Sequence, residues 1–299
     1  MDIVVTGASG LIGRALTTAL TNEGHRVVPL VRRSPRPGED AIAWNPEAGT
    51  IDADSLEGFD AVVHLAGEGI AERRWTPQQK LRILNSRVDG TTLLATTLAG
   101  LTDKPSVLLS GSAIGFYGDR GDEELTEESG PGAIFLSEVC EAWERATAAA
   151  EAADIRVTHL RTGIVLDPSG GALSKTLPLF KLALGGRLGS GRQWWSWISL
   201  EDEVGAIRFL LDHDVRGPVN LTAPHPVTNA EFTKVLGNVL GRPTVLPVPA
   251  FGPKLLLGAE LAEQLLFTSA RVLPSTLVDA GFEFTSPDLD GALRKELGK

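Results

Sequence analysis

The sequence predicts an α/β protein with a doubly wound parallel sheet and a smaller substrate-side domain at its C-terminal end. Short apolar runs of strand length alternate with longer segments in which apolar residues recur at helical spacing. Glycine-rich turns follow several of the short runs, as they do where a parallel sheet binds a nucleotide. The length of 299 residues allows one large domain and a small appended one.

The start of the chain predicts a strand, a tight glycine turn and a helix. Asp2–Thr6 is a short, mostly apolar run, and apolar residues recur at helical spacing after the turn. Gly7 allows a sharp turn, Gly10 lets the backbone approach a pyrophosphate, and Gly13 lets the helix pack closely. The helix directs free N–H groups and the positive end of its dipole at the phosphates. The residues expected to contact a dinucleotide are Gly7, Ser9, Gly10, Leu11, Ile12 and Gly13.

Two arginines follow the second predicted strand, Arg26–Val31. NAD enzymes place an acidic residue there against the ribose hydroxyls, whereas Arg32 and Arg33 offer guanidinium groups to a 2′-phosphate. The plain alternative is an ordinary turn followed by an exposed basic loop. Because strand, turn, helix and basic pair occur in the right order, we expect NADP as the cofactor.

The composition narrows the class of partner. With 28 basic and 38 acidic residues the net charge is −10, and the resulting field repels nucleic acids and anionic membranes. No apolar run is long enough to span a bilayer and the first strand begins too early for a signal peptide, so we expect a cytoplasmic protein. The single cysteine, Cys140, is expected to be a buried helix residue, and no His/Cys cluster predicts a metal site.

Two further strands are expected to end beside the cofactor. The apolar run Phe59–Gly67 ends in a small-residue turn, and Leu65, Ala66 and Gly67 are expected to line the nicotinamide side. Within this run His64 has no acidic neighbour and is expected to be a core histidine. A later strand, 106–110, runs into a segment that carries hydroxyl groups to the same edge of the sheet.

The helix between these two strands has several start signals. Thr76 is a capping residue, Pro77 occupies the first helical position, and Gln79 is placed to reach back to the cap. The helix is expected to run to about Leu98.

Several motifs together resemble the extended short-chain dehydrogenase/reductase superfamily of sugar-nucleotide epimerases and dehydratases. The glycine turn, Leu65-Ala66-Gly67 and the serine-rich strand end followed by Tyr117-Gly118 are typical of the superfamily. An atypical epimerase-like subgroup, some members of which are labelled cell-division inhibitors, resembles the chain in Arg74-Trp75-Thr76, Ser86-Arg87-Val88, Gly115-Phe116-Tyr117-Gly118, Leu160-Arg161-Thr162-Gly163, Trp197-Ile198-Ser199 and Arg271-Val272-Leu273-Pro274. The resemblance covers nearly the whole chain and implies a Rossmann fold of the extended type.

The acid–base pair of the superfamily is missing from this sequence. In the superfamily a Ser and a Tyr act with a Lys four residues after the Tyr, and the Lys lowers the pKa of the phenol. This chain has a single tyrosine, Tyr117, and the residue four places later is Gly121. The segment 133–139, where the pair belongs, contains neither a Tyr nor a Lys.

Three residues remain as catalytic candidates. Ser112 matches the superfamily serine best and is expected to hydrogen-bond a substrate carbonyl, with Tyr117 or Glu138 supplying the proton. Without a lysine, Tyr117 would titrate near the ordinary phenol pKa of about 10, and Glu138 would need burial to raise its pKa. The alternative for Glu138 is an exposed residue in the first turn of a helix, where its charge favours the dipole.

The second half of the chain is expected to form the rest of the site. Arg161 ends another core strand and matches the superfamily loop that borders the nicotinamide. The segment 187–197 combines two arginines with three tryptophans, and it forms either a ligand anchor or a packed flap or oligomer contact. Asp202 is expected to cap the helix that follows it.

We predict a Rossmann, epimerase-like domain over residues 1–245 and a small, mostly helical domain over residues 246–299. The resemblance implies an NADP-dependent oxidoreductase or epimerase that acts on a small hydroxyl- or carbonyl-bearing substrate, which could be nucleotide-linked, in a chain that could form a homo-oligomer. The alternative is a regulatory or structural protein that binds NADP without turnover. The missing Tyr/Lys pair favours the alternative, whereas the serine at the strand end favours the enzyme.

Overall fold

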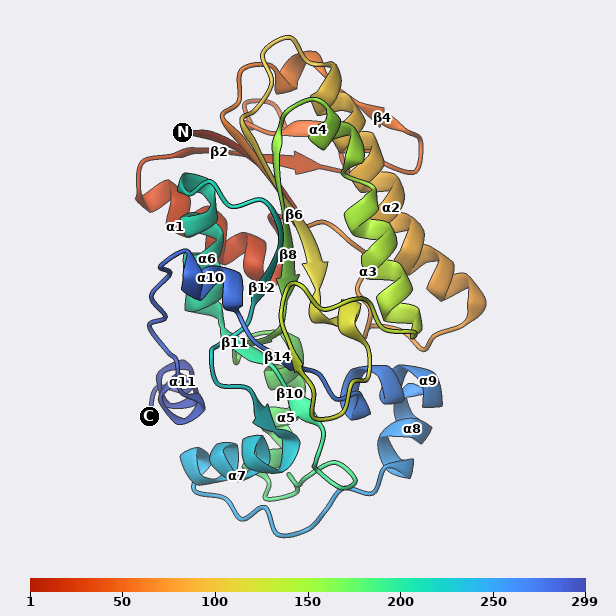
Figure 1. Ribbon diagram of the computed structural model, residues 1–299, viewed down its shortest axis with the longest axis vertical. Helices are drawn as coiled ribbons and strands as arrows, with labels where there is room; N and C mark the ends of the chain where they lie inside the picture. Colours follow the sequence, from red (N-terminus) through yellow and green to blue (C-terminus); the bar gives the residue numbers. More distant parts are fainter.

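An eight-stranded sheet forms the upper part of the molecule in the computed structural model, which describes residues 1–299 (Figure 1). The strands lie in the order β12-β8-β6-β5-β1-β2-β3-β4, and all neighbours are parallel except β3 and β4. Their bounds are β1 (Asp2–Thr6), β2 (Arg26–Val31), β3 (Ile42–Asn45), β4 (Thr50–Ile51), β5 (Ala61–His64), β6 (Val107–Ala113), β8 (Arg156–Thr162) and β12 (Gly217–Leu221). The order changes direction at β1, so a crevice is expected at the carboxyl ends of β1 and β5.

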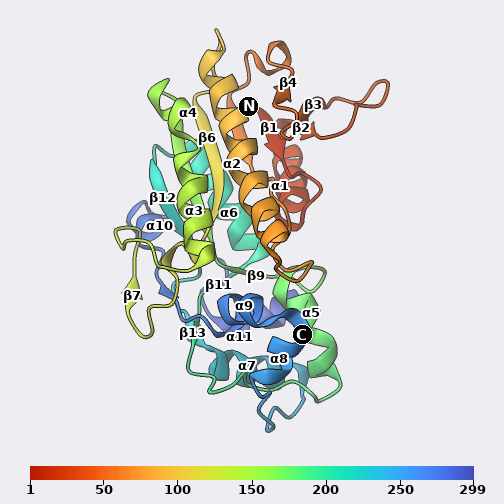
Figure 2. The same ribbon diagram turned by 90° about the vertical axis from the view of Figure 1, so that its right-hand side faces the viewer.

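Helices cover both faces of this sheet (Figure 2). One face carries α1 (Leu11–Asn22) and α6 (Leu200–Asp212), and the other carries α2 (Pro77–Gly100), α3 (Phe135–Arg145) and α4 (Ala148–Ala152). Val63 and Leu109 point into the first layer, whereas Val62 and Leu108 point into the second. Because neighbouring strand residues face opposite sides, strands covered on both sides read as continuous apolar runs. None of the helices combines the length and the apolar composition needed to cross a bilayer.

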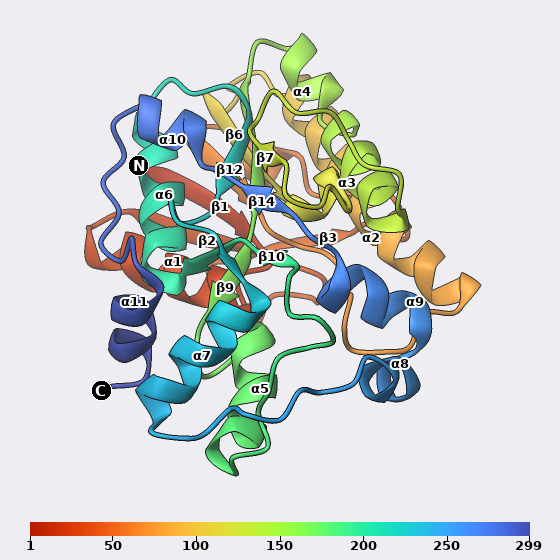
Figure 3. The same cartoon turned by 60° about the horizontal axis from the view of Figure 1, so that its bottom comes forward.

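Helices and short strands make up the lower part of the molecule (Figure 3), and a separate hydrophobic core holds them together. It is formed by α5 (Gly171–Lys181), α7 (Asn229–Leu240), α11 (Leu289–Glu296), β9 (Ile164–Leu166), β10 (Trp194–Trp195), β11 (Trp197–Ser199) and β13 (Val227–Thr228). Trp195 and Trp197 are buried in this core, and the ring of Trp194 donates through Nε1 to Asp122. The three tryptophans therefore form a packed flap, which was one of the two alternatives for this segment.

The tail contacts both parts of the molecule. Its elements are α8 (Phe251–Leu257), α9 (Ala259–Ala262), a π-helical turn (Glu263–Phe267), β14 (Arg271–Val272), which pairs with β7 (Glu124–Leu125), α10 (Ser275–Asp279) and α11. Lys80 at the start of α2 donates to Glu260 over 2.6 Å, and Gln264 accepts the N–H of Leu136 at the start of α3 over 3.1 Å. The division of the chain at residue 245 stays a prediction, and the tail covers the lower ends of α2 and α3.

Two predictions about helix ends are corrected by the side-chain contacts. Ser199 caps α6 by accepting the N–H of Asp202, whereas the carboxylate of Asp202 accepts the N–H of Thr285 over 2.7 Å and so holds the tail. Thr76 and Pro77 start α2 as predicted. The side chain of Gln79, however, does not reach back to the cap, because it donates to the carboxylate of Glu68.

Candidate functional site

The turn between β1 and α1 forms one side of the crevice. Gly7 has a φ of +67°, which favours glycine, and a Cβ there would lie 2.7 Å from the carbonyl oxygen of Leu65. A Cβ on Gly13 would lie 2.2 Å from the oxygen of Gly7, so α1 can begin this close to the turn only with glycine. Gly10 and Ser9 are exposed, and no side chain caps the helix. The first N–H groups of α1 are therefore free to bind an anion, as the sequence predicts.

Thr6 and His64 hold the loop 65–66 in place through hydrogen bonds. The Oγ1 atom of Thr6 accepts the N–H groups of Leu65 and Ala66 over 3.0 and 3.1 Å, which uses both of its lone pairs. Thr6 therefore donates its own proton to Nδ1 of His64, and His64 donates from Nε2 to Thr91. Burial lowers the pKa of His64 to about 4, so the ring is neutral at physiological pH. The prediction of a core histidine is confirmed, and its function is to position the loop 65–66.

The two arginines after β2 have different surroundings. Arg32 is exposed and makes no hydrogen bond or ion pair within the chain, whereas Arg33 pairs with Glu39 and lowers the pKa of that carboxyl to about 2. A hollow of about 420 Å³ lies between them and the next two strands. It is lined by Arg32, Arg33, Ser34, Ala43, Trp44, Asn45, Thr50, Ile51 and Asp52. Arg32 is therefore free for an anion, whereas a ligand would have to compete with Glu39 for Arg33.

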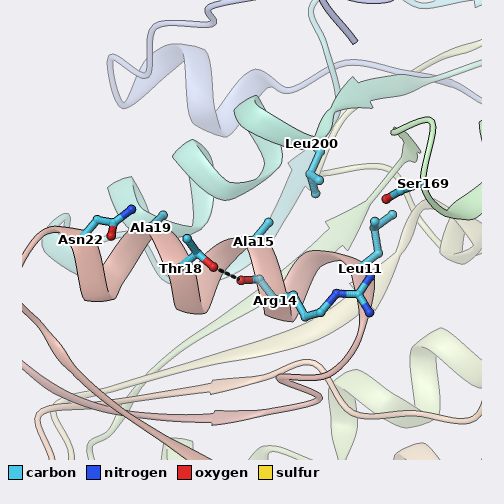
Figure 4. Close-up of a pocket in the computed structure, with 8 residues that line it drawn as sticks. All are labelled: Leu11, Arg14, Ala15, Thr18, Ala19, Asn22, Ser169 and Leu200. Atoms are coloured by element: carbon cyan, nitrogen blue, oxygen red, sulfur yellow. Dashed lines mark hydrogen bonds between the residues drawn. The ribbon is translucent and has the colours of Figure 1, made fainter. Parts of the chain in front are cut away.

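A second hollow, of about 530 Å³, lies along α1 and extends to Ser169 and to Leu200 at the start of α6 (Figure 4). Its lining consists of Leu11, Arg14, Ala15, Thr18, Ala19, Asn22, Ser169 and Leu200. The guanidinium of Arg14 donates to the backbone oxygen of Ser9 over 3.1 Å, and the side chain of Leu11 points towards Ser169. This hollow belongs to the helix layer and not to the carboxyl ends of the strands. The contact of Leu11 with a dinucleotide stays a prediction, and the group of Leu11 that faces the turn is its backbone N–H.

Ser112 points into the helix layer and not into an open turn. Strand β6 continues past it, its side chain is nearly buried, and its Oγ atom donates to Glu144 in α3 over 2.7 Å. Arg161 donates to both carboxylate oxygens of Glu144, over 2.8 and 2.9 Å, and its Nη1 atom donates to the hydroxyl of Tyr117 over 3.0 Å. That hydroxyl donates to Asn220 over 2.6 Å. We call Ser112, Glu144, Arg161, Tyr117 and Asn220 the inner network.

The inner network changes the role of two predicted residues. Tyr117 is fully buried and burial raises its pKa to about 12, so it can neither reach a substrate nor exchange a proton readily at neutral pH. Arg161 uses Nε and both Nη atoms within the network and lies 3.5 Å from the ring centroid of Phe116. The expected proton donor Tyr117 and the expected cofactor contact Arg161 are therefore corrected to residues that hold Glu144 in place.

Glu144 is the carboxylate that accepts from Ser112, and it is not among the residues predicted from the sequence. Glu138 is exposed in the first turn of α3, which is the position of its helix-dipole alternative, and its carboxylate makes no hydrogen bond. Glu144 lies on the buried side of the same helix, four residues after the buried Cys140. A carboxylate on the apolar face of an amphipathic helix indicates a buried partner, and this signal was present in the sequence.

The first turns of α3 present apolar groups where the resemblance places the acid–base pair. Phe135 packs edge-on against Trp75 with 5.1 Å between ring centroids, and Val139 is buried. Cys140 is buried as expected, and burial raises the pKa of its thiol to about 12. None of these side chains can exchange a proton at neutral pH.

A buried carboxyl lies on the opposite face of the sheet. Glu203 in α6 is fully buried, accepts from the hydroxyl of Thr162 over 2.8 Å, and leaves its Oε2 atom without a partner. Burial raises the pKa of Glu203 to about 8, so it is protonated at neutral pH. Thr162 ends β8, and this acid therefore lies directly behind the edge of the crevice.

Comparisons with known proteins agree with this geometry. The model of the NAD dependent epimerase/dehydratase family matches residues 3–222, and a domain of unknown function (DUF1731) matches residues 248–296. Epimerase family protein MT2273 of Mycobacterium tuberculosis is 44% identical over 292 residues, covering 97% of this chain and 96% of the relative.

Two solved structures share both the fold and substantial sequence identity. Human epimerase family protein SDR39U1 (isoform2), crystallised with NADPH, has a TM-score of 0.92 at 32% identity and covers 100% of both chains. The nucleoside-diphosphate sugar epimerase of Corynebacterium glutamicum has a TM-score of 0.80 at 40% identity, over 100% of this chain and 58% of that one. The predicted fold class and the predicted epimerase-like resemblance are thereby confirmed, and the chain belongs to the NAD dependent epimerase/dehydratase family.

Proposed function

We propose that the chain is an NADP-dependent oxidoreductase or epimerase-type enzyme that acts on a small hydroxyl- or carbonyl-bearing substrate. The observation that carries the proposal is the open turn after β1, whose free helix N–H groups lie next to the end of β2 and its unpaired Arg32. A pyrophosphate fits the first group and a 2′-phosphate fits the second. The NADPH in the human relative supports the same choice of cofactor.

In this proposal, different residues of the crevice contact different parts of the cofactor. Gly7, Ser9 and Gly10 leave the backbone open to the pyrophosphate, since a side chain at Gly7 would collide with the next loop. The loop 65–67, held by Thr6 from below, lies beside the nicotinamide in this proposal. A bound NADP would supply hydride transfer to or from a carbon of the substrate.

Ser112 and Glu144 are the groups of this site that can relay a proton. Because Ser112 donates to Glu144, the lone pairs of its oxygen remain able to accept a hydrogen bond from a substrate hydroxyl. In the oxidation direction, the proton of that hydroxyl passes to Oγ of Ser112 while the proton of Ser112 passes to Glu144. Arg161 and Tyr117 position the carboxylate. In the reduction direction both protons move the opposite way, from Glu144 to Ser112 and from Ser112 to the carbonyl oxygen of the substrate.

The substrate class is supported by the relatives alone. The Corynebacterium glutamicum protein is called a nucleoside-diphosphate sugar epimerase, and a nucleotide-linked sugar is accordingly one substrate to test. The alternative function, a regulatory or structural protein that binds NADP without turnover, is favoured by one observation. The inner network satisfies its own hydrogen bonds and needs no ligand to do so.

Turnover of NADPH separates the two functions. Purified protein is given NADPH and a panel of carbonyl compounds and nucleotide sugars, and the loss of absorbance is followed at several pH values. The enzyme hypothesis predicts turnover that Ser112→Ala reduces at least tenfold. The matched control is Ser174→Ala, a half-buried serine of α5 whose hydroxyl donates to the backbone oxygen of Gly171 in its own helix. NADPH binding without turnover of any compound would favour the alternative, and unchanged turnover in Ser112→Ala would remove Ser112 from the chemistry.

A further inference from the structure

An arginine without an anionic partner lies at the carboxyl edge of the sheet. Arg87 in α2 places its guanidinium beside Gly67, where a Cβ would lie 3.1 Å from Cζ of the arginine. The same guanidinium lies over the ring of Trp143 in α3, with 4.8 Å from Cζ to the ring centroid. The two helices lie side by side here (Figure 2). Arg87 therefore occupies the gap between α2 and α3 directly behind the end of β5.

Arg87 is held in place but not neutralised. Its Nη1 atom donates to the backbone oxygens of Glu68 and Ile83 over 3.0 and 3.2 Å, whereas Nε and Nη2 have no acceptor in the chain. None of the ion pairs of the chain includes Arg87. Burial lowers the pKa of Arg87, yet a guanidinium keeps its charge at neutral pH. A partly buried cation without a counter-ion is unfavourable, and a bound anion removes that penalty.

Two other cations near the crevice already have carboxylate partners. Arg161 is paired with Glu144, and Lys80 at the start of α2 is paired with Glu260. Under the proposed function, the pyrophosphate of the cofactor is bound at the β1–α1 turn and its 2′-phosphate at Arg32. The phosphates of the cofactor are thereby all assigned, and Arg87 remains available for a second anion.

We propose that Arg87 binds an anionic group of the substrate, a carboxylate or a phosphate, beside the nicotinamide. The proposal rests on the proposed function, because the bound cofactor defines where the nicotinamide lies. The free atoms Nε and Nη2 form one edge of the guanidinium, and such an edge binds two oxygens of a carboxylate or phosphate at once. Gly67 has no side chain beside Cζ and Nη1 of this guanidinium, so the loop packs close to Arg87 without displacing it. The substrate is therefore an acidic carbonyl or hydroxyl compound and not a neutral one.

Anion binding to the cofactor-loaded protein tests this proposal. Inorganic phosphate and malonate are titrated calorimetrically into the NADPH-saturated protein, with ionic strength held constant by chloride. We expect Arg87→Gln to weaken the binding of both anions at least tenfold. Arg87→Lys should weaken it several-fold, because lysine keeps the charge but cannot donate two parallel hydrogen bonds. Arg82→Gln, an exposed arginine of the same helix bonded to Gln79, is the matched control and should bind like the wild type. NADPH affinity should stay within twofold in all four proteins.

Three results would overturn the assignment. One is the absence of phosphate and malonate binding to the NADPH-loaded wild type, and another is equal anion affinity in the wild type and Arg87→Gln. The third is a tenfold loss of NADPH affinity in Arg87→Gln without an effect on the anions, which would assign Arg87 to the cofactor. Thermal unfolding shows whether each variant is folded. If Arg87→Gln does not fold, the anion affinities of Arg87→Lys and the wild type decide the assignment. If the wild type binds no NADPH, the proposed function fails, while titration of the cofactor-free protein still tests Arg87.

Discussion

At the nucleotide end of the crevice, the turn after β1 leaves helix N–H groups and Arg32 without protein partners. At the chemistry end, by contrast, Ser112, Glu144 and Arg161 bond to one another and are nearly buried. The polar groups of the nucleotide end therefore find partners only in a ligand, whereas those of the chemistry end are partners of one another. Polar residues at the ends of parallel strands are the usual candidates for catalysis, but here most of them stabilise the fold.

This difference separates two kinds of mutational effect. A change at the nucleotide end should reduce cofactor binding and leave the free energy of unfolding nearly unchanged. A change in the inner network should lower that free energy, and at Ser112 or Glu144 it should also remove the proposed proton relay. Three of the following four variants test this division and one tests the buried Glu203, in order of decreasing effect.

The largest effect is expected for Glu144→Ala. The change leaves the buried guanidinium of Arg161 without its carboxylate, and breaking a buried ion pair in this way costs about 3–5 kcal/mol of unfolding free energy. Glu141→Ala on the same helix removes an exposed pair with Arg145 and should cost about 0–1 kcal/mol. Urea unfolding measures both. Equal losses in the two variants would contradict a structural role for the inner network.

The next effect is a change of stability with pH in Glu203→Gln. The pKa of this carboxyl is about 8 in the folded chain against an ordinary value of 4.5, so its favourable contribution is complete below pH 4.5 and is lost as pH rises to about 8. Glutamine does not titrate and keeps an acceptor for Thr162. Relative to the wild type, the variant should therefore gain about 3 kcal/mol between pH 4 and pH 7. Urea unfolding at pH 4 and pH 7 measures this gain, and the exposed Glu201→Gln is the control. If the difference in unfolding free energy between Glu203→Gln and the wild type were the same at both pH values, the pKa of Glu203 would not be raised.

A smaller effect, confined to ligand binding, is expected for Arg32→Asp. Loss of a charge-assisted hydrogen bond and introduction of a negative charge should cost NADPH about 1.5–3 kcal/mol of binding free energy, or about tenfold or more in Kd. NADH lacks the 2′-phosphate and should lose little. Arg36→Asp, an exposed arginine outside the lining of the neighbouring hollow, is the control for the change in net charge. Parallel losses for both dinucleotides would show that Arg32 does not read the 2′-phosphate.

The smallest of the four effects is expected for Gly10→Ala. A Cβ there would meet only the oxygen of Gly7, at 3.2 Å, and alanine in place of glycine at a helix cap costs about 1 kcal/mol or less. The added methyl group lies where the pyrophosphate approaches, so NADPH affinity should fall by about fivefold, or about 1 kcal/mol. Calorimetric titration and thermal unfolding measure the two effects. A larger loss of stability than of affinity would contradict the division between the two ends.

The nucleotide end could be predicted because its determinants are local. The strand, the turn with Gly7 and Gly13, and the helix follow one another within 22 residues, and each glycine has a steric reason in the structure. The cap of α2 at Thr76 and the buried His64 were also predicted, since both depend on short-range patterns. The cytoplasmic location and the division at residue 245 stay predictions.

The chemistry end could not be predicted in the same way. Strand β6 extends to Ala113 and not to residue 110, and this extension turns the side chain of Ser112 towards α3. The partners of Asp202 and Tyr117 lie 83 and 103 residues away in the chain, and such distant contacts leave no local pattern. The sequence alone therefore shows which residues at this edge are polar. It does not show whether they hydrogen-bond to a ligand or to each other.

The most direct test is calorimetric titration of the wild-type protein with NADPH and with NADH under identical conditions. We expect one site per chain that binds NADPH, with an affinity for NADPH at least tenfold higher than for NADH. If folded protein gave no heat with either dinucleotide, or bound both equally, the nucleotide end would not be the site described above, and the proposed function would be wrong.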